Sequence, residues 1–259
     1  MSTAPLLRAT GIEKRFGALV AASAIEISIA AGERVSLIGS NGAGKTTFVN
    51  MITGYLKPDA GSIVLAGRDI TQLHPRASAR LGVARSFQIP QLYPALTVLE
   101  NMLVAIACRG ERLSFWQTAR RAGPLQKAGA LLDRFGLAEH RERRVAELPG
   151  GVRKLLDVAM ALTGQPQLLL LDEPTSGVSA DEKFPMMEII MTALGAAPMT
   201  VLFVEHDMEI VSRYADRVIA FAGGRIIADA TPAVALATDE VRRHVTGTPV
   251  APAGAGPTC

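Results

Sequence analysis

The chain has 259 residues, of which 49% are hydrophobic and 20% are charged, as in an ordinary globular protein with one substantial core. Its formal charge of +3, from 27 basic and 24 acidic residues, is too small and too dispersed to indicate a nucleic-acid partner. We recognise no signal peptide, and no apolar run reaches the roughly 18 residues of a membrane span, so we expect a cytoplasmic protein.

The N-terminal region predicts a small antiparallel sheet. Ile25, Ile27 and Ile29 alternate with polar or small residues, as residues on one face of a strand do. Up to about residue 35 we therefore expect antiparallel strands, which lead into a further strand over Val35–Ile38.

A phosphate-binding loop follows that strand. Residues 39–46 read Gly-Ser-Asn-Gly-Ala-Gly-Lys-Thr, which matches the pattern G-x-x-x-x-G-K-[ST], and an amphipathic helix that ends near Gly54 comes next. Backbone N–H groups of such a loop face the phosphates of a nucleoside triphosphate, while Lys45 reaches the β- and γ-phosphates and Thr46 the Mg²⁺. The nucleotide-binding residues predicted here are Gly39, Ser40, Asn41, Gly42, Ala43, Gly44, Lys45, Thr46 and Thr47.

The middle of the chain changes from strand to helix. Short strands are predicted over 62–65 and 83–87, and apolar residues then recur at helical spacing from residue 97 to about 162. This region contains Cys108, which we expect to be a small buried residue, because it and Cys259 give neither a disulfide framework nor a metal-binding spacing. The pattern predicts a helical block inserted into a mixed α/β core.

The core resumes with two continuous apolar runs over 168–171 and 200–204, which are typical of strands buried on both faces. A strand over 217–221, a Gly-Gly turn, another short strand and a helical tail ending near Gly247 follow. Residues 248–259 are rich in Pro, Ala and Gly, and we expect them to be disordered.

Polar residues at three strand ends suggest catalysis. Asp172 and Glu173 close one buried strand, where a P-loop ATPase places its Mg²⁺-organising aspartate, and a following glutamate can polarise the attacking water. His206 follows the next strand and would reach the γ-phosphate if the strands are parallel neighbours. Gln88 ends an earlier strand and could join the Mg²⁺ or water shell. The alternatives are solvated strand-end carboxylates and a histidine that is merely a satisfied polar group.

The phosphate loop, Gln88, Leu148-Pro-Gly-Gly-Val152, the segment 168–173 and His206 together resemble, in order and spacing, the ATP-binding subunit of ABC transporters over nearly the whole chain. The resemblance implies a P-loop NTPase (RecA-like) α/β core with an N-terminal antiparallel β subdomain and an inserted helical signature subdomain. It implies one domain over residues 1–247, with the core at about 1–88 and 163–247 and the helical subdomain at about 89–162.

The same resemblance implies a role for each site residue. Phe16 would stack on adenine, Gln88 would sense the nucleotide and couple to the membrane subunit, and Asp172 would order Mg²⁺. Glu173 would be the general base, and His206 would stabilise the γ-phosphate. The cofactors implied are ATP and Mg²⁺, and the implied metal ligands are Thr46, Gln88 and Asp172.

Two such subunits are implied to sandwich two ATP molecules. Each site would join one chain's phosphate loop to the other chain's signature, here Gly150 and Gly151. This chain has Pro149 where the family signature usually has serine and Val152 where it has glutamine, and proline lacks both a hydroxyl and a backbone N–H. Ser179 also stands where the family commonly has Asp or Asn. We therefore expect a heterodimer with a second, different ATPase rather than a homodimer.

A closer resemblance points to importers of branched-chain and other hydrophobic amino acids. It is carried by Ala84-Arg-Ser-Phe-Gln88, Leu96-Thr-Val-Leu-Glu-Asn101, a helical segment around Phe115 and Trp116, and Val204-Glu-His-Asp-Met208. It implies an ATPase on the inner face of the cell membrane, bound to separate permease subunits and served indirectly by an external substrate-binding protein.

We expect the segment Ile89–Leu103 to receive a permease helix, with Leu92 and Tyr93 in contact, unless these two pack in the subdomain's own core. Alternatives for the whole chain are a weakly active regulatory subunit, or an importer motor for urea, amides or aromatic acids. A soluble ABC protein of DNA repair or translation is disfavoured by the single phosphate loop, and a P-loop kinase by the lack of an identifiable acceptor pocket.

Overall fold

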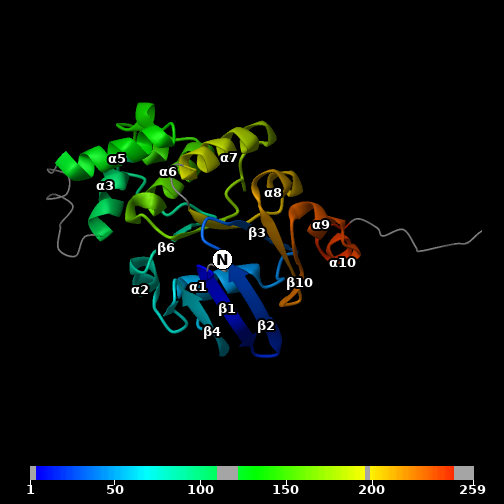
Figure 1. Cartoon of the computed structure of the whole chain (residues 1–259). Coiled ribbons are helices and arrows are strands. Elements are labelled where there is room, and N and C mark those ends of the chain that lie inside the picture. Colours follow the sequence, from blue (N-terminus) through cyan, green and yellow to red (C-terminus); the bar gives the residue numbers. More distant parts are fainter. Residues whose placement is uncertain (1–3, 110–121, 196–198, 248–259) are drawn as a thin grey trace, which may run out of the picture.

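The computed structural model describes residues 4–109, 122–195 and 199–247, and these form two sheets and a group of helices (Figure 1). The smaller sheet has the order β2-β1-β4-β5, and all of its strand pairs are antiparallel. The predicted N-terminal antiparallel strands are thereby confirmed. The strands are β1 (Leu7–Phe16), β2 (Leu19–Ile29), β4 (Ala60–Leu65) and β5 (Arg68–Asp69).

The larger sheet has the order β10-β9-β3-β8-β7-β6. Its pairs from β9 to β6 are parallel, and β10 runs antiparallel to β9. The carboxyl ends of β3, β8, β7 and β6 therefore meet along one edge. The strands are β3 (Arg34–Gly39), β6 (Val83–Ser86), β7 (Leu168–Asp172), β8 (Thr200–Val204), β9 (Arg217–Ala222) and β10 (Arg225–Ala230).

The helices surround the larger sheet. Helix α1 begins at Lys45, within the phosphate-loop motif, and ends before Gly54, whose φ of 79° and N–H bond to Met51 O (3.2 Å) cap it as predicted. Short single-turn segments cover 138–140, 145–147, 162–164 and 242–246. The helices are α1 (Lys45–Thr53), α2 (Pro75–Arg80), α3 (Val98–Arg109), α5 (Ala122–Arg134), α6 (Gly150–Ala161), α7 (Ala180–Leu194), α8 (Met208–Tyr214), α9 (Pro232–Ala237) and α10 (Asp239–Val241).

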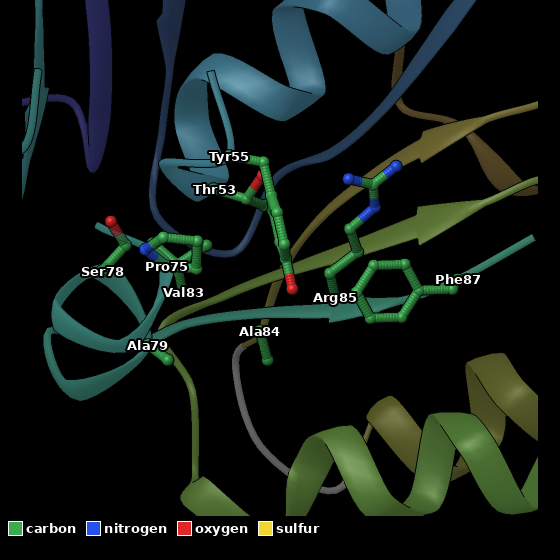
Figure 2. A pocket seen from close by; sticks show the side chains of 9 residues that line it. All are labelled: Thr53, Tyr55, Pro75, Ser78, Ala79, Val83, Ala84, Arg85 and Phe87. Atoms are coloured by element: carbon green, nitrogen blue, oxygen red, sulfur yellow. The ribbon is translucent and has the colours of Figure 1, made fainter. Parts of the chain in front are cut away.

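A small hollow of about 170 Å³ lies where α1, α2 and β6 meet (Figure 2). Tyr55 and Phe87 pack edge to face at its rim, with ring centroids 6.1 Å apart. Ser78 Oγ and Arg85 Nε are buried here and have no hydrogen-bond partner within the described part of the chain. The hollow is thus lined by polar as well as aromatic groups.

The two faces of the larger sheet belong to different cores, because alternate residues of a strand point to opposite sides. Leu168 and Leu170 of β7 pack with α1 and the small sheet, whereas Leu169 and Leu171 pack with α3, α5, α6 and α7. A third cluster, around Ile38, lies beneath α8, α9 and α10. This burial on both faces explains the uninterrupted apolar runs of β7 and β8.

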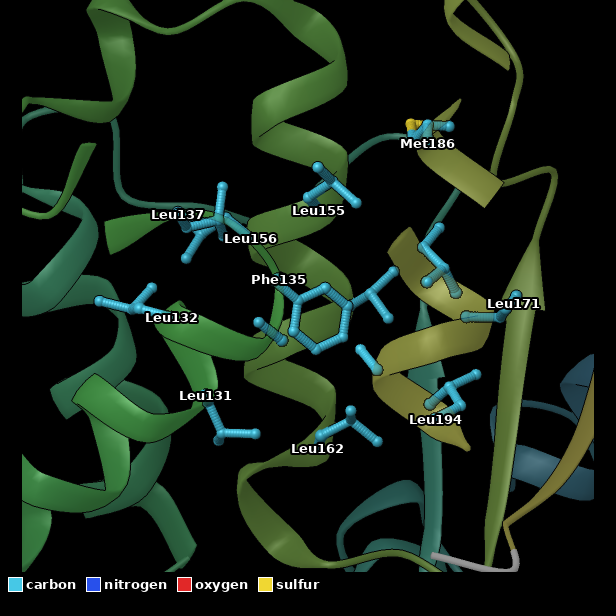
Figure 3. Close-up of a cluster of buried hydrophobic side chains, with 14 of the residues drawn as sticks. Leu131, Leu132, Phe135, Leu137, Leu155, Leu156, Leu162, Leu171, Met186 and Leu194 are labelled. Carbon is cyan, nitrogen blue, oxygen red and sulfur yellow. The ribbon is translucent and has the colours of Figure 1, made fainter. Parts of the chain in front are cut away.

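The helical block has a core of its own that joins the sheet (Figure 3). Phe135, at the end of α5, is fully buried and lies among leucines of α5 and α6. Leu171 of β7 and Met186 of α7 belong to the same cluster. The block therefore packs on one face of the sheet through a continuous apolar contact.

Most predicted elements are confirmed within one or two residues, but two points differ. Helices α2, α7 and α8 are absent from the sequence-based prediction, and Pro185 lies inside α7. The prediction that Cys108 is buried is wrong, because it lies at the end of α3 with its side chain exposed. The expected segment around Phe115 and Trp116 and the expected disorder of 248–259 fall outside the described residues. Among the described helices, none is long and apolar enough to cross a membrane.

Candidate functional site

The candidate site lies at the edge where the parallel strands β3, β6, β7 and β8 end. Asp172 is in register with Val204, the last residue of β8, and Glu173 N–H donates to Val204 O at 3.0 Å. Gln88 follows the end of β6, and His206 follows the end of β8. The topology thus brings together the polar residues that the sequence placed at separate strand ends, as expected for carboxyl ends of parallel strands.

The phosphate loop connects β3 to α1 in a conformation that requires glycine. Gly44 has a φ of 110°, and a Cβ there would lie 2.5 Å from Ala21 O. Lys45 is buried, and its ammonium donates to Gly39 O at 2.7 Å and Ser40 O at 3.0 Å. Burial lowers the pKa of Lys45, and the negative charges of Glu173 and Asp172 oppose that shift. The lysine head therefore lies within its own loop, where phosphate oxygens could replace the two carbonyls.

Glu173 is held by three side chains. Gln88 Nε2 donates to Glu173 Oε2 at 2.6 Å, and His206 Nε2 lies 3.0 Å from Glu173 Oε1. The Lys154 ammonium donates to the Glu173 backbone oxygen at 2.8 Å. The backbone of Glu173 has a φ of 49°, in the left-handed region that non-glycine residues seldom adopt. An open hollow of about 580 Å³ lies beside Glu173 and His206 and is lined by residues 175–178 and 205–208.

Asp172 is buried at the end of β7 and forms an ion pair with Arg85 of β6. Together with the Thr46 hydroxyl and the Gln88 amide, its carboxylate gives the oxygen ligands that Mg²⁺ prefers. No group of three or more His, Cys, Asp or Glu side chains in the described residues would hold a metal ion. A Mg²⁺ site needs only one or two protein ligands beside phosphates, so these residues fit the ion.

The residue expected to stack on adenine and the residues of the signature lie on other elements. Phe16, at the end of β1, is 50% exposed, and its ring centroid is 5.7 Å from the Lys14 ammonium. Gly150 and Gly151 begin α6, directly after Pro149. In this single chain Gly150 lines a hollow together with Ile89 and Leu92.

Two departures from the family pattern have structural roles. Val152 is half-buried against the helical core. Ser179 precedes α7 as its N-terminal cap residue, and its hydroxyl donates to Glu182 Oε2 at 2.7 Å.

Sequence reasoning missed a buried acid in the helical block. Asp157 of α6 accepts hydrogen bonds from Ser86 Oγ (2.6 Å), Phe87 N (3.0 Å) and Gln91 N (3.2 Å). Burial raises the pKa of Asp157, and these hydrogen bonds oppose the rise. The available signal was a single carboxylate within the apolar run Leu155–Ala159. Asp157 thereby ties α6 to the backbone on both sides of Gln88.

Sequence reasoning also missed Glu205, which is buried and accepts from Thr175 N at 3.1 Å and Thr175 Oγ1 at 2.8 Å. It steadies the loop that follows Glu173 against the end of β8. His206 comes next in the chain, followed by Asp207, which caps α8.

A model of the ABC transporter family matches residues 22–176. The high-affinity branched-chain amino acid transport ATP-binding protein LivG of Salmonella typhimurium is 37% identical over 235 residues, which cover 88% of this chain and 92% of that protein. The corresponding protein BraF of Pseudomonas aeruginosa is 33% identical over 237 residues, with 88% and 92% covered.

Solved structures agree with this match. A nucleotide-free ATP-binding cassette from an ABC transporter superposes with a TM-score of 0.82 at 32% identity, covering 92% of this chain and 97% of that one. The ADP conformation of such a cassette also gives a TM-score of 0.82 at 32% identity, covering 93% and 98%. The similarity therefore extends over both sheets and the helical block.

Proposed function

Because the chain belongs to the ABC transporter family, as an ATP-binding subunit that hydrolyses ATP, we propose that it is the motor of an importer for branched-chain or related hydrophobic amino acids. The observation that carries the catalytic part is the position of Glu173. Its carboxylate lies between Gln88 and His206 at the strand edge that also carries the phosphate loop. We also propose that the chain divides into a core, at about 1–88 and 163–247, and a helical subdomain, at about 89–162, as expected from the sequence.

In this proposal Glu173 is the general base and accepts a proton from the attacking water. His206 holds the γ-phosphate, Lys45 the β- and γ-phosphates, and Phe16 stacks on adenine. Thr46, Gln88 and Asp172 would hold Mg²⁺, which when bound neutralises charge on the phosphate oxygens. Gln88 touches the base directly, so its movement would report the state of the site to the segment that follows it.

The substrate proposal rests on the names of the similar proteins, which are branched-chain amino acid transport ATP-binding proteins at 33% and 37% identity. The test is uptake by vesicles that contain this chain with the permease subunits and second ATPase that co-purify with it, supplied with a substrate-binding protein. We expect ATP-dependent uptake of leucine, isoleucine or valine. Uptake of urea, amides or aromatic acids in their place would contradict the substrate class while leaving the motor role intact.

We propose that the working unit is a heterodimer bound to permease subunits at the inner face of the cell membrane. Pro149 and Val152 support a different partner, because the signature that this chain would offer lacks the serine hydroxyl and the glutamine amide. The same two residues favour the alternative of a weakly active regulatory subunit. ATP turnover of the assembled complex, measured with the catalytic glutamate of each subunit replaced in turn, separates an active motor subunit from a regulatory one.

A further inference from the structure

Arg85 joins three elements that surround the proposed metal site. Its side chain extends from β6 on the side opposite to Ala84 (Figure 2). Nη1 donates to Asn50 Oδ1 of α1 at 2.7 Å, and Nη2 donates to Asp172 Oδ2 of β7. The guanidinium also lies 5.0 Å from the centroid of the Phe87 ring. The side chains of Arg85 and Asp172 are only 9% and 10% exposed, so solvent screens their interaction weakly.

These bonds link Asp172, one of the three proposed metal ligands, to the helix that carries another, Thr46. Asn50 comes four residues after Thr46 in the same helix, so both lie on one face of α1. The guanidinium is a planar fork whose donors keep a fixed spacing. By holding Asn50 with one nitrogen and Asp172 with another, Arg85 sets where the Asp172 carboxylate stands relative to the helix face that carries Thr46.

The Asp172 carboxylate is engaged on one side only. Oδ2 accepts from Arg85, while Oδ1 accepts no hydrogen bond from any residue that the structure describes. An acidic ligand normally has one oxygen held by an outer hydrogen bond and the other turned to the metal. Arg85 therefore holds one carboxylate oxygen and leaves the other free to bind a metal, as expected of an arginine that orients the carboxylate rather than one that occupies the metal position.

We propose that Arg85 is a positioning residue for Mg²⁺–nucleotide, which aligns Asp172 Oδ1 with the Thr46 hydroxyl through its simultaneous bonds to Asn50 and Asp172. The inference rests on the proposed role of Asp172 as a metal ligand. It assigns a function to a residue that binds neither the metal nor the phosphates. Because Gln88 follows Arg85 by three residues, just beyond the end of β6, the positioning residue and the residue that contacts Glu173 lie close together in the chain.

The test measures ADP affinity of the full chain by calorimetry, once with excess Mg²⁺ and once with EDTA. The ratio of the two affinities isolates the contribution of the metal, and ADP avoids turnover. Arg85→Met should lower this ratio roughly tenfold to a hundredfold, as loss of an outer-shell partner does, and leave the affinity in EDTA unchanged. Arg85→Lys should restore only part of the ratio, because an ammonium keeps the charge but not the fork. Arg80→Met, an exposed change on α2, is the matched control for loss of a positive charge.

Asn50→Ala keeps the ion pair and removes the tether to α1, so it should lower the ratio by a smaller factor. It also decides the matter if Arg85→Met fails to fold. An unchanged or higher ratio in Arg85→Met would overturn the inference, and a higher ratio would mean that Arg85 competes with the metal. If the methionine variant is unfolded, an unchanged ratio in Asn50→Ala would overturn it instead. Asp172→Asn tests the underlying proposal separately: if it leaves the ratio at the wild-type value, Asp172 is no metal ligand, whatever Arg85 does.

Discussion

Glu173 is fixed through its backbone as well as its side chain. Its N–H is bonded to the end of β8 and its carbonyl to Lys154, while Gln88 and His206 hold the carboxylate. A left-handed backbone at a residue with a side chain costs on the order of 1 to 3 kcal/mol. These bonds hold the residue in that conformation, so the carboxylate is presented at the sheet edge rather than turned away from it.

Phe16 gives a prediction at the scale of one residue. Phe16→Ala should weaken ATP binding by about 1 to 3 kcal/mol, or roughly 5- to 150-fold, because stacking on a base has that value. The half-exposed ring has few contacts to lose within the chain, so the melting temperature should hardly change. Titration with a fluorescent ATP analogue measures the effect, and Phe16→Trp is the control that should retain affinity. Equal affinity in the alanine variant would place the adenine elsewhere.

At the scale of elements, Asp157 links α6 to the loop around Gln88. A buried acid with a raised pKa favours the folded state only when it is protonated, so its contribution is complete below the reference value of 3.8 and is lost as the pH rises through the folded pKa. Asparagine does not titrate. The stability of Asp157→Asn relative to wild type should therefore improve as the pH rises from about 4 to about 7.

Urea unfolding of both proteins at several pH values measures this difference, in which the other titrating groups cancel. The exposed Asp133→Asn on α5 controls for the change of net charge. If the stability of Asp157→Asn relative to wild type stays constant or falls with rising pH, burial does not raise the pKa of Asp157.

The segment after Gln88 gives a second prediction at this scale. The structure separates its two expected contact residues: Leu92 packs against the helical core, whereas Tyr93 is 51% exposed. Tyr93→Asp should therefore prevent assembly with the permease or uncouple ATPase from transport, with nucleotide affinity nearly intact. Co-purification and vesicle uptake measure this, with Val234→Asp, another exposed apolar position, as control. Unimpaired transport in the Tyr93 variant would refute the docking site.

The sequence predicts those elements that depend on local pattern. The phosphate loop, its capped helix and the apolar strands are readable because glycine positions and burial on both faces leave marks on neighbouring residues. Side-chain partners between elements leave no such marks. Arg85 and Asp172 are 87 positions apart, and nothing near Arg85 indicates its partner. Cys108 was wrongly predicted to be buried. Its helix is apolar, but Cys108 lies in the last turn of that helix, where its side chain is exposed.

At the scale of the whole molecule, the chain combines an intact phosphate loop with an altered signature. Pro149 precedes the first residue of α6 and can offer neither a hydroxyl nor an N–H to a partner's nucleotide. A missing charge-assisted contact costs about 1.5 to 3 kcal/mol, or roughly tenfold to over a hundredfold in rate if it acts wholly on the transition state. One of the two sites in a heterodimer should thus hydrolyse slowly.

Pro149→Ser with Val152→Gln should therefore raise ATPase activity of the isolated chain, and should raise it less in the presence of the partner. Because Val152 is half-buried, Pro149→Ser alone separates the gain at the signature from any loss of stability. Steady-state phosphate release with and without the partner is the measurement. An isolated wild-type chain that is already as fast as the restored one would contradict the asymmetry.

The central claim is that this chain hydrolyses ATP with Glu173 as the base, and turnover of Glu173→Gln in the assembled complex tests it most directly. The amide keeps the shape of the side chain and removes the base, so phosphate release should fall by roughly 10² to 10⁴-fold while ATP affinity is retained. Lys45→Ala is the contrasting variant, because it should damage binding itself. Turnover of Glu173→Gln at the wild-type rate would contradict the account.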